Sequence, residues 1–390
     1  MDYLKKKSPI DGKAFFILDL IEKYGYAARI VGGAVRNFLM DIEFSDIDIA
    51  TTATPVEILD ICNANNLYFV PTGIKYGSVL VVYKNKPYEI TTLREDVKAF
   101  GRHTEVKFTK SFEADAARRD FTINAIYMDK EGEIYDYNSG IKDIRNKNIR
   151  FIGNAQKRIE EDYLRILRYF RFVVTYGNYR CNQEYLNIIS KLKTNLRILS
   201  SERIISELLK IFATPDSYKA VLIMREVLDE LFLLKTDSLN ACEKLKIFDS
   251  LSASERFAML LKFAKPPKEY NFPKNIREMI NLKIVDFSQL FQQLKRTKKE
   301  YREFYVKFIT VNSFLNEKAS DISLKELLDF CRSDYIDFQL KADDLKSFFP
   351  TKDELKKVMM AVKQHWLDNN ISPEECKSLA SKHLLQYRKK

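Results

Sequence analysis

Residues 29–37, RIVGGAVRN, most constrain what this chain can fold into. Gly32 and Gly33 end a mostly apolar stretch over 27–31 and open a run with helical character over 34–40. Glycine lets a backbone come close to a phosphate, and the N–H groups at a helix start favour negative charge. The pattern predicts a strand, a glycine turn and a helix whose first turn can hold a phosphate.

A pair of carboxylates follows nine residues later, Asp46 and Asp48, in the alternating sequence SDIDIA. A strand over 45–50 would place both carboxylates on one face and the isoleucines between them in a core. An isolated pair of this kind is more often a solvated strand face. Behind a glycine turn it favours a site for two Mg²⁺ ions about 4 Å apart. Glu89, on a neighbouring predicted strand, is either a third carboxylate or an exposed strand residue.

The composition narrows the class of protein. The 390 residues carry a net charge of +11, which suits a polyanionic partner such as nucleic acid or reflects a generally basic surface. Five scattered cysteines without CxxC spacing disfavour a disulfide framework or a zinc site and fit a reducing cytoplasm. No long apolar run could span a bilayer, so we expect no membrane partner. The oligomeric state stays open.

Secondary-structure patterns divide the chain in two. Up to about residue 150 they are mixed, with a helix over 55–65, a loop over 93–111 and a strand pair around Tyr127 and Tyr135. From Gln156 onward, apolar residues recur at spacings of three and four, which predicts helices to the end. The first part therefore predicts a two-layer α+β domain. The other expected strands are 68–71, 78–83 and 88–92, and the helical stretches are 163–174, 203–212, 220–234, 252–263, 298–315 and 354–366.

A second polar segment, residues 118–124 (RRDFTIN), pairs arginines with Asp120 and Asn124. Arg119 and its neighbours offer fixed donors and acceptors for ribose and triphosphate oxygens. Surface arginines paired with local acids are the alternative.

The third segment is residues 161–171, EDYLRILRYFR. On one helix Asp162 and Arg165 would share a face, as a base-reading pair or as an ordinary intrahelical ion pair. Cytosine and adenine each present an amino donor beside a ring-nitrogen acceptor, so a carboxylate and a guanidinium would select CTP and ATP together. Arg168 lies near that face. Arg171 is nine residues beyond Asp162, on the opposite side of an ideal helix.

These three segments, in this order and spacing, resemble class II tRNA nucleotidyltransferases, the CCA-adding enzymes of the DNA polymerase beta superfamily. Bacterial poly(A) polymerases share the same head and neck motifs. The resemblance covers roughly residues 28 to 212, and SERIISE at 201–207 resembles the family's later neck motif. Two residues depart from the family pattern: Asn37 replaces a usual Asp, which would loosen a contact at the helix start, and Tyr163 replaces a small residue or Pro.

The resemblance implies a nucleotidyltransferase head over 1–150, a helical neck over 151–215 and a helical body and tail over 216–390 that hold tRNA. It also implies a flexible loop from about residue 93 to 106, containing His103, that permits the switch from C to A. The expected activity is Mg²⁺-dependent addition of C-C-A to tRNA from CTP and ATP. The alternatives are poly(A), A-only or CC-only synthesis and a non-catalytic RNA-binding relative. The implied catalytic and metal-binding residues are Asp46 and Asp48, with Glu89 beside them, and the implied nucleotide ligands are Gly33, Arg36, Arg119, Asp162, Arg165, Arg168 and Arg171.

Overall fold

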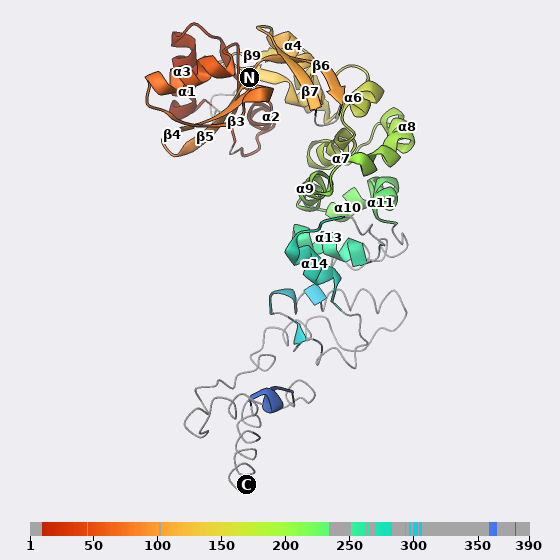
Figure 1. Cartoon of the computed structure of the whole chain (residues 1–390). Coiled ribbons are helices and arrows are strands. Elements are labelled where there is room, and N and C mark those ends of the chain that lie inside the picture. The colour runs from red at the N-terminus through yellow and green to blue at the C-terminus, as the bar shows by residue number, and fades with distance from the viewer. Residues whose placement is uncertain are drawn as a thin grey trace, which may run out of the picture. The chain divides into compact units, whose positions relative to one another are not determined.

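A computed structural model gives the fold of the chain (Figure 1). It describes residues 10–44, 46–100, 103–233, 251–262, 264 and 270–282, together with isolated positions within 293–305 and 359–364 and residue 379. The chain forms two compact units, Met1–Leu231 and Phe232–Lys390. The domain boundaries expected near residues 150 and 215 stay a prediction.

A seven-stranded sheet forms the centre of the first unit, and one neighbouring pair, β2 with β5, is parallel while the others are antiparallel. The expected strands are therefore confirmed, each within a few residues. In spatial order the strands are β3 (Tyr68–Gly73), β4 (Ser78–Tyr83), β5 (Lys86–Thr92), β2 (Asp48–Thr51), β1 (Ala28–Val31), β8 (Ile126–Met128) and β9 (Ile134–Asp136).

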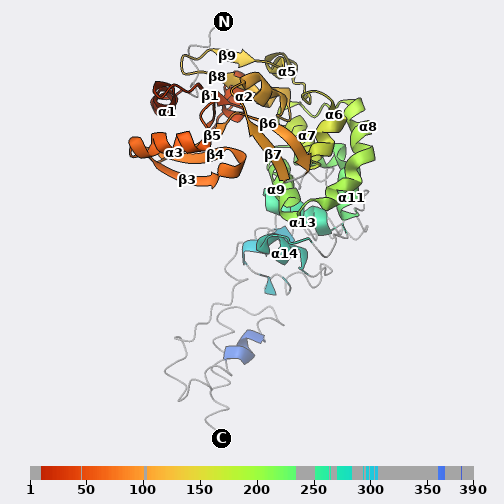
Figure 2. The same cartoon turned by 45° about the horizontal axis from the view of Figure 1, so that its top comes forward.

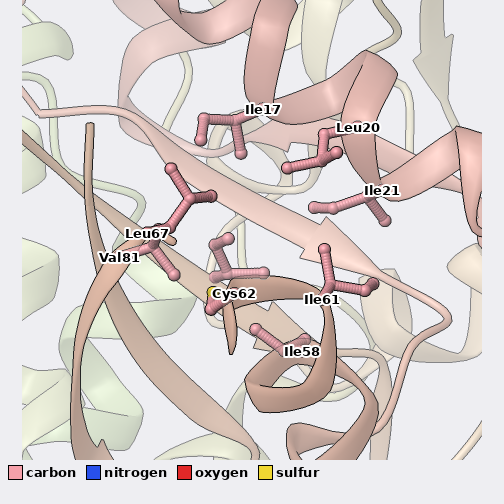
Figure 3. Close-up of a pocket in the computed structure, with 9 residues that line it drawn as sticks. Ile17, Leu20, Ile21, Ile58, Ile61, Cys62, Leu67 and Val81 are labelled. Atoms are coloured by element: carbon pink, nitrogen blue, oxygen red, sulfur yellow. The ribbon is translucent and has the colours of Figure 1, made fainter. Parts of the chain in front are cut away.

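Helices α1 (Gly12–Lys23) and α3 (Pro55–Ala64) pack on one face of this sheet. Figure 3 shows Ile17 and Ile21 of α1 meeting Ile58 and Cys62 of α3 around a small apolar cavity. Nothing polar lines this cavity, so it belongs to the core. The expected helix over 55–65 is confirmed, and a capping box fixes its start: the Thr54 backbone N–H donates to Glu57 Oε2 at 2.6 Å.

The opposite face of the sheet carries a second, smaller core. Val31, Ala50 and Tyr127 of three neighbouring strands pack there against Phe112 and Ala116 of α4 (Phe112–Ala117). Side chains two apart on a strand share a face, so Asp48 lies on the same side of the sheet as Ala50. The acidic pair thus faces α4 and the segment that follows it.

Residues 94–100 and 103–108 form two paired strands, called the hairpin below, so the expectation of a loop over 93–111 was wrong. β6 (Arg94–Phe100) pairs with β7 (His103–Phe108), and Glu95 lies opposite Lys107. The sequence of this segment lacks the strict apolar alternation that predicts a strand, while opposite charges across the two strands support the pairing. Figures 1 and 2 show the hairpin projecting from the sheet toward α7. Gly101 lies outside the described residues.

The rest of the first unit is helical except for the confirmed strand pair β8 and β9, in which Tyr127 faces Tyr135. The helices expected near 163–174 and 203–212 are confirmed. Residues 220–234 were expected to form one helix, because the apolar spacing continues across Met224, but the structure has two helices that meet at this residue. The elements are η1 (Ile74–Tyr76), η2 (Thr122–Asn124), α2 (Gly33–Met40), α5 (Gly140–Asn146), α6 (Ala155–Glu161), α7 (Leu164–Tyr176), α8 (Gln183–Leu192), η3 (Lys193–Ile198), α9 (Ser201–Phe212), α10 (Ser217–Ile223) and α11 (Arg225–Phe232).

In the second unit the described elements are α13 (Ala253–Lys262), α14 (Lys274–Ile280) and η5 (Lys299–Tyr301). α13 confirms the helix expected over 252–263. The helices expected over 298–315 and 354–366 lie largely outside the described residues. None of the helices that the structure describes is both long enough and apolar enough to cross a membrane.

Candidate nucleotide and metal site

The glycine turn has the predicted strand–turn–helix form. Gly32 adopts φ 74° and ψ −119°, a conformation that side chains rarely tolerate, and it is the N-cap of α2. Its N–H donates to the Ile126 carbonyl at 3.2 Å, and its own carbonyl accepts the Arg36 N–H at 3.0 Å. The turn therefore presents the first N–H groups of α2 beside the end of β1.

The two predicted aspartates lie on one face, as expected. Asp46 and Asp48 are exposed, whereas Ile47 and Ile49 are 2% and 0% exposed. Asp48 opens β2, and its register partner on the parallel strand β5 is Glu89. Partners in register point to the same side of a sheet, so strand pairing brings the third candidate carboxylate beside Asp48.

The charges of these groups act on one another. The pKa of Asp48 is raised to about 6. The main cause is desolvation, because protein atoms surround the carboxylate although the residue reaches solvent. The negative charges of Glu89 and Asp46 raise the pKa further, whereas the positive charge of Arg119 lowers it. Within the described parts of the chain, no three His, Cys, Asp or Glu side chains are arranged to hold a metal ion. The aspartate pair still has the oxygen donors that hard divalent cations prefer, and such a cation would relieve the repulsion at Asp48.

Arg119 is held beside this acidic group by Asp115 of α4. Its Nε and Nη2 donate to Asp115 Oδ2 at 3.1 and 3.0 Å, and Arg118 pairs with the other oxygen of Asp115. Burial alone would raise the pKa of Asp115, but Arg119, Arg118 and the Tyr127 hydroxyl bring it below its ordinary value. The remaining Arg119 nitrogen, Nη1, lies 3.7 Å from where a Cβ on Gly32 would be, so it faces the glycine turn.

Arg36 approaches the same turn from α2. The side chain is buried, and its hydrogen-bond partners are neutral: Asn124 at 2.5 Å, Asn37 at 2.8 Å and the Tyr176 hydroxyl at 2.7 Å. Burial lowers the pKa of Arg36 below its ordinary value. Among the described residues, no carboxylate accepts a hydrogen bond from this buried cation. A bound anion would therefore complete its hydrogen-bond shell.

Asn37, the departure from the family pattern, keeps a contact at the helix start. Its Oδ1 accepts from Arg36, and its Nδ2 donates to the Glu43 carbonyl at 2.9 Å. An amide here orients Arg36 without neutralising its charge.

Arg168 and Arg171 share one face of α7 and join the cluster. Both guanidiniums lie over the Phe172 ring, as does that of Arg36, at 5.6, 4.6 and 5.4 Å. Arg168 pairs with Asp120 and Arg171 with Glu207 of α9. Burial would raise the pKa of Asp120, but Arg168 and Asn124 lower it to about 2.

Asp162 and Arg165 do not share a helix face, so this part of the prediction was wrong. Asp162 is extended (φ −154°, ψ 105°) between α6 and α7. Its Oδ1 accepts the Leu164 N–H at 3.1 Å, and its Oδ2 accepts Arg203 Nη2 of α9 at 2.8 Å. The extended backbone at Asp162 ends α6, and its side chain bonds to the first N–H of α7, which spacing alone could not reveal. Because Asp162 lies between two helices, its nine-residue spacing from Arg171 does not place the two side chains on opposite sides of one helix.

Sequence reasoning missed the residues that hold the site together. Asp115, Arg158, Tyr176 and Arg203 each contact a predicted site residue. Only Asp115 leaves a sequence signal, since it lies three and four residues before the arginine pair, where helical neighbours meet.

Two sequence families match this part of the chain. Residues 28–150 match the poly A polymerase head domain, and residues 179–230 match the family described as a probable RNA and SrmB-binding site of polymerase A. The first match covers the glycine turn, all three carboxylates and the arginine pair.

Curated relatives include human "CCA tRNA nucleotidyltransferase 1, mitochondrial", 42% identical over 200 residues, which are 50% of this chain and 46% of the relative. The CCA-adding enzyme of Bacillus cytotoxicus is 37% identical over 211 residues, 54% of this chain and 52% of the relative. The chain thus spans about half the length of the curated relatives it matches.

Solved structures share the fold over most of the chain. The CCA-adding enzyme of Bacillus stearothermophilus in complex with CTP superposes with a TM-score of 0.71 at 23% identity, over 98% of this chain and 100% of the other. A tRNA nucleotidyltransferase complexed with a primer tRNA and an incoming ATP analog gives 0.60 at 20% identity, over 81% and 98%. The predicted α+β head with a helical remainder is confirmed.

Proposed function

We propose that this chain adds C, C and A to the 3′ end of tRNA, because residues 28–150 match the poly A polymerase head domain and named CCA-adding enzymes are similar to about half of the chain. CTP and ATP are the substrates, and pyrophosphate is the second product. The single observation that carries the proposal is the meeting of an acidic group and a cationic group at one glycine turn. Asp48 and Glu89 pair in register while Arg119 and Arg36 face the turn.

In this proposal Asp46 and Asp48 are the metal ligands, and Glu89 adds a third negative charge beside them that a bound cation would offset. Mg²⁺ held by the two aspartates supplies charge neutralisation for the triphosphate and lowers the pKa of the attacking hydroxyl. Asp48 must be deprotonated to act, and its raised pKa of about 6 leaves it largely ionised at neutral pH.

The phosphates are held by the turn and the arginines around it. Gly33 offers a backbone N–H without a side chain in the way, and Arg36 and Arg119 supply two positive charges from different elements. Since Asp115 occupies Nε and Nη2 of Arg119, the nitrogen that faces Gly32 is the one left to meet a phosphate oxygen. These contacts orient the α-phosphate for in-line attack by the tRNA 3′-hydroxyl.

In this proposal Asp162 and Arg165 select the base. Asp162 lies in the connection between α6 and α7, and Arg165 lies in the first turn of α7. Arg165 uses Nη1 for its bonds within the protein, and its Nε and Nη2 make no hydrogen bond with the described residues. Each carboxylate oxygen of Asp162 accepts one bond and retains capacity for an amino group. Arg168 and Arg171 add positive charge beside the nucleotide.

The RNA partner is proposed to be tRNA. The net charge of +11 and the match of residues 179–230 to a probable RNA-binding segment support an RNA backbone contact. The cytoplasmic location stays a prediction, since the human relative carries "mitochondrial" in its name.

The test is to incubate the protein with tRNA that lacks its 3′ CCA, with Mg²⁺ and each nucleotide alone or in combination. We expect two C additions with CTP and one further A when ATP is also present. Long A tracts would indicate a poly(A) polymerase, and A-only or CC-only products would indicate a partial enzyme. Binding without any addition would indicate an RNA-binding relative. Asp46→Asn is the matched inactive control, since it preserves shape and removes the charge.

A further inference from the structure

Arg158, in the middle of α6, connects two segments that the proposed function assigns to one nucleotide. Its side chain is buried, and its Nη2 donates to the main-chain carbonyls of Arg118 and, at 2.6 Å, of Arg119. These carbonyls belong to the arginine pair whose side chains Asp115 holds on the other side. Arg119 is therefore fixed twice, through its guanidinium by Asp115 and through its main chain by Arg158.

The same arginine also fixes Arg165. Arg158 Nη1 donates to Glu161 Oε2 at 2.6 Å, and Arg165 Nη1 donates to that same oxygen at 2.5 Å. Arg165 Nη1 also donates to the Arg158 carbonyl at 2.7 Å. The three residues form a closed ring that spans the break between α6 and α7. This ring points the unused edge of the Arg165 guanidinium in one direction.

We infer that Arg158 is a positioning residue for base selection: it sets Arg165 relative to Arg119 through Glu161 and the Arg118–Arg119 carbonyls. The inference rests on the proposed function, in which Arg119 contacts the triphosphate side of the nucleotide and Arg165 its base. The distance from phosphate to base in a nucleotide varies only within a limited range, so the two arginines must keep a matching separation to bind both ends at once.

The contacts of Arg158 also indicate which step of the reaction it affects. Arg168 and Asp120 form a second connection between α7 and the segment after Arg119, so loss of Arg158 leaves the segments joined. Loss of the Arg158 side chain unties Glu161, and with it Arg165, from the Arg118–Arg119 carbonyls. Arg165 keeps its bonds to Glu161 and to the main-chain carbonyl of residue 158, and the metal ligands on β2 keep their places. The effect should therefore fall on the choice of base more than on the chemical step.

Four variants separate this role from general support of the fold. Arg158→Ala removes every side-chain contact, and Arg158→Lys keeps the charge and can reach one carbonyl. Arg197→Ala is the matched control, because Arg197 likewise binds a carbonyl and a carboxylate, those of Glu230, but joins η3 to α11. Glu161→Gln weakens the ring without shortening a side chain, and it replaces Arg158→Ala if that variant does not fold.

The measurement is the discrimination between CTP and UTP, as the ratio of kcat/KM on tRNA lacking CCA and as the ratio of dissociation constants without tRNA. A misplacement of about 1 Å in such a site costs on the order of 100-fold. We expect Arg158→Ala to reduce both ratios by about tenfold or more, Arg158→Lys to recover part of the loss and Arg197→Ala to keep both ratios.

Two results would overturn the inference. One is an Arg158→Ala or Glu161→Gln protein that is folded and discriminates as the parent does. The other is an equal loss of kcat/KM for CTP and UTP, because that means structural support only. A parent protein that binds CTP and UTP equally contradicts the proposed function itself, and the inference falls with it.

Discussion

Replacing Gly32 with alanine tests the glycine turn directly. At φ 74° and ψ −119° an L-residue is strained, which costs about 1–3 kcal/mol. The added Cβ would meet the Asn124 carbonyl at 3.6 Å and Arg119 Nη1 at 3.7 Å, which are ordinary van der Waals distances. No steric clash adds to this cost, so the expected loss in the free energy of unfolding is about 2 kcal/mol, from backbone strain alone.

Gly33→Ala is the matched control one residue away. Gly33 has no positive φ, and its Cβ would lie 3.7 Å from Arg36 Nη2. Alanine in a helix is favoured over glycine by up to about 1 kcal/mol, so this variant should be as stable as the parent or slightly more so. Its methyl group occupies space assigned to a phosphate, and we expect KM for CTP to rise on the order of tenfold.

Differential scanning calorimetry of the full chain measures the stability of each variant. A destabilisation of about 2 kcal/mol in a unit of this size lowers Tm by roughly 4–8 °C for Gly32→Ala, with no loss for Gly33→Ala. Hydrogen exchange of peptides from α2 should show the same order. A Gly32→Ala protein that melts within about 1 °C of the parent would refute the reasoning, because the turn would not need glycine.

Three further outcomes follow from the site. Asp48→Asn should abolish nucleotide addition but melt at or above the parent's Tm at pH 7, because it removes a carboxylate whose pKa burial and Glu89 raise to about 6. The raised pKa means that the parent gains stability as pH falls through about 6, so the two Tm values should converge toward pH 5, and divergence contradicts this. Asp162→Ala should weaken exclusion of UTP and GTP, and parent-like exclusion would mean that Asp162 does not select the base. Replacing residues 96–103 with a short Gly/Ser link should accumulate tRNA ending in C-C, whereas equal loss of C and A addition, or no loss, argues against a switching role for the hairpin.

Local patterns predicted the elements around the turn because each depends on neighbours in sequence. The strand before Gly32, the alternation of Asp46 and Asp48 with buried isoleucines, and the helix over 55–65 all arise within a few residues. The strands over 94–100 and 103–108 escaped prediction because their sequence lacks a strict hydrophobic period.

The sequence by itself determined which chemical groups the site contains, since carboxylates, arginines and paired glycines are visible as residue types at short spacings. Only the tertiary structure decided how they meet. The pairing of Asp48 with Glu89 requires two strands 41 residues apart to lie parallel and in register. The direction of the Asp162 carboxylate requires Arg203, 41 residues further along the chain, to hold one of its oxygens. Side-chain bonds between distant segments leave no period in the sequence, and in this site they set the direction of each charged group.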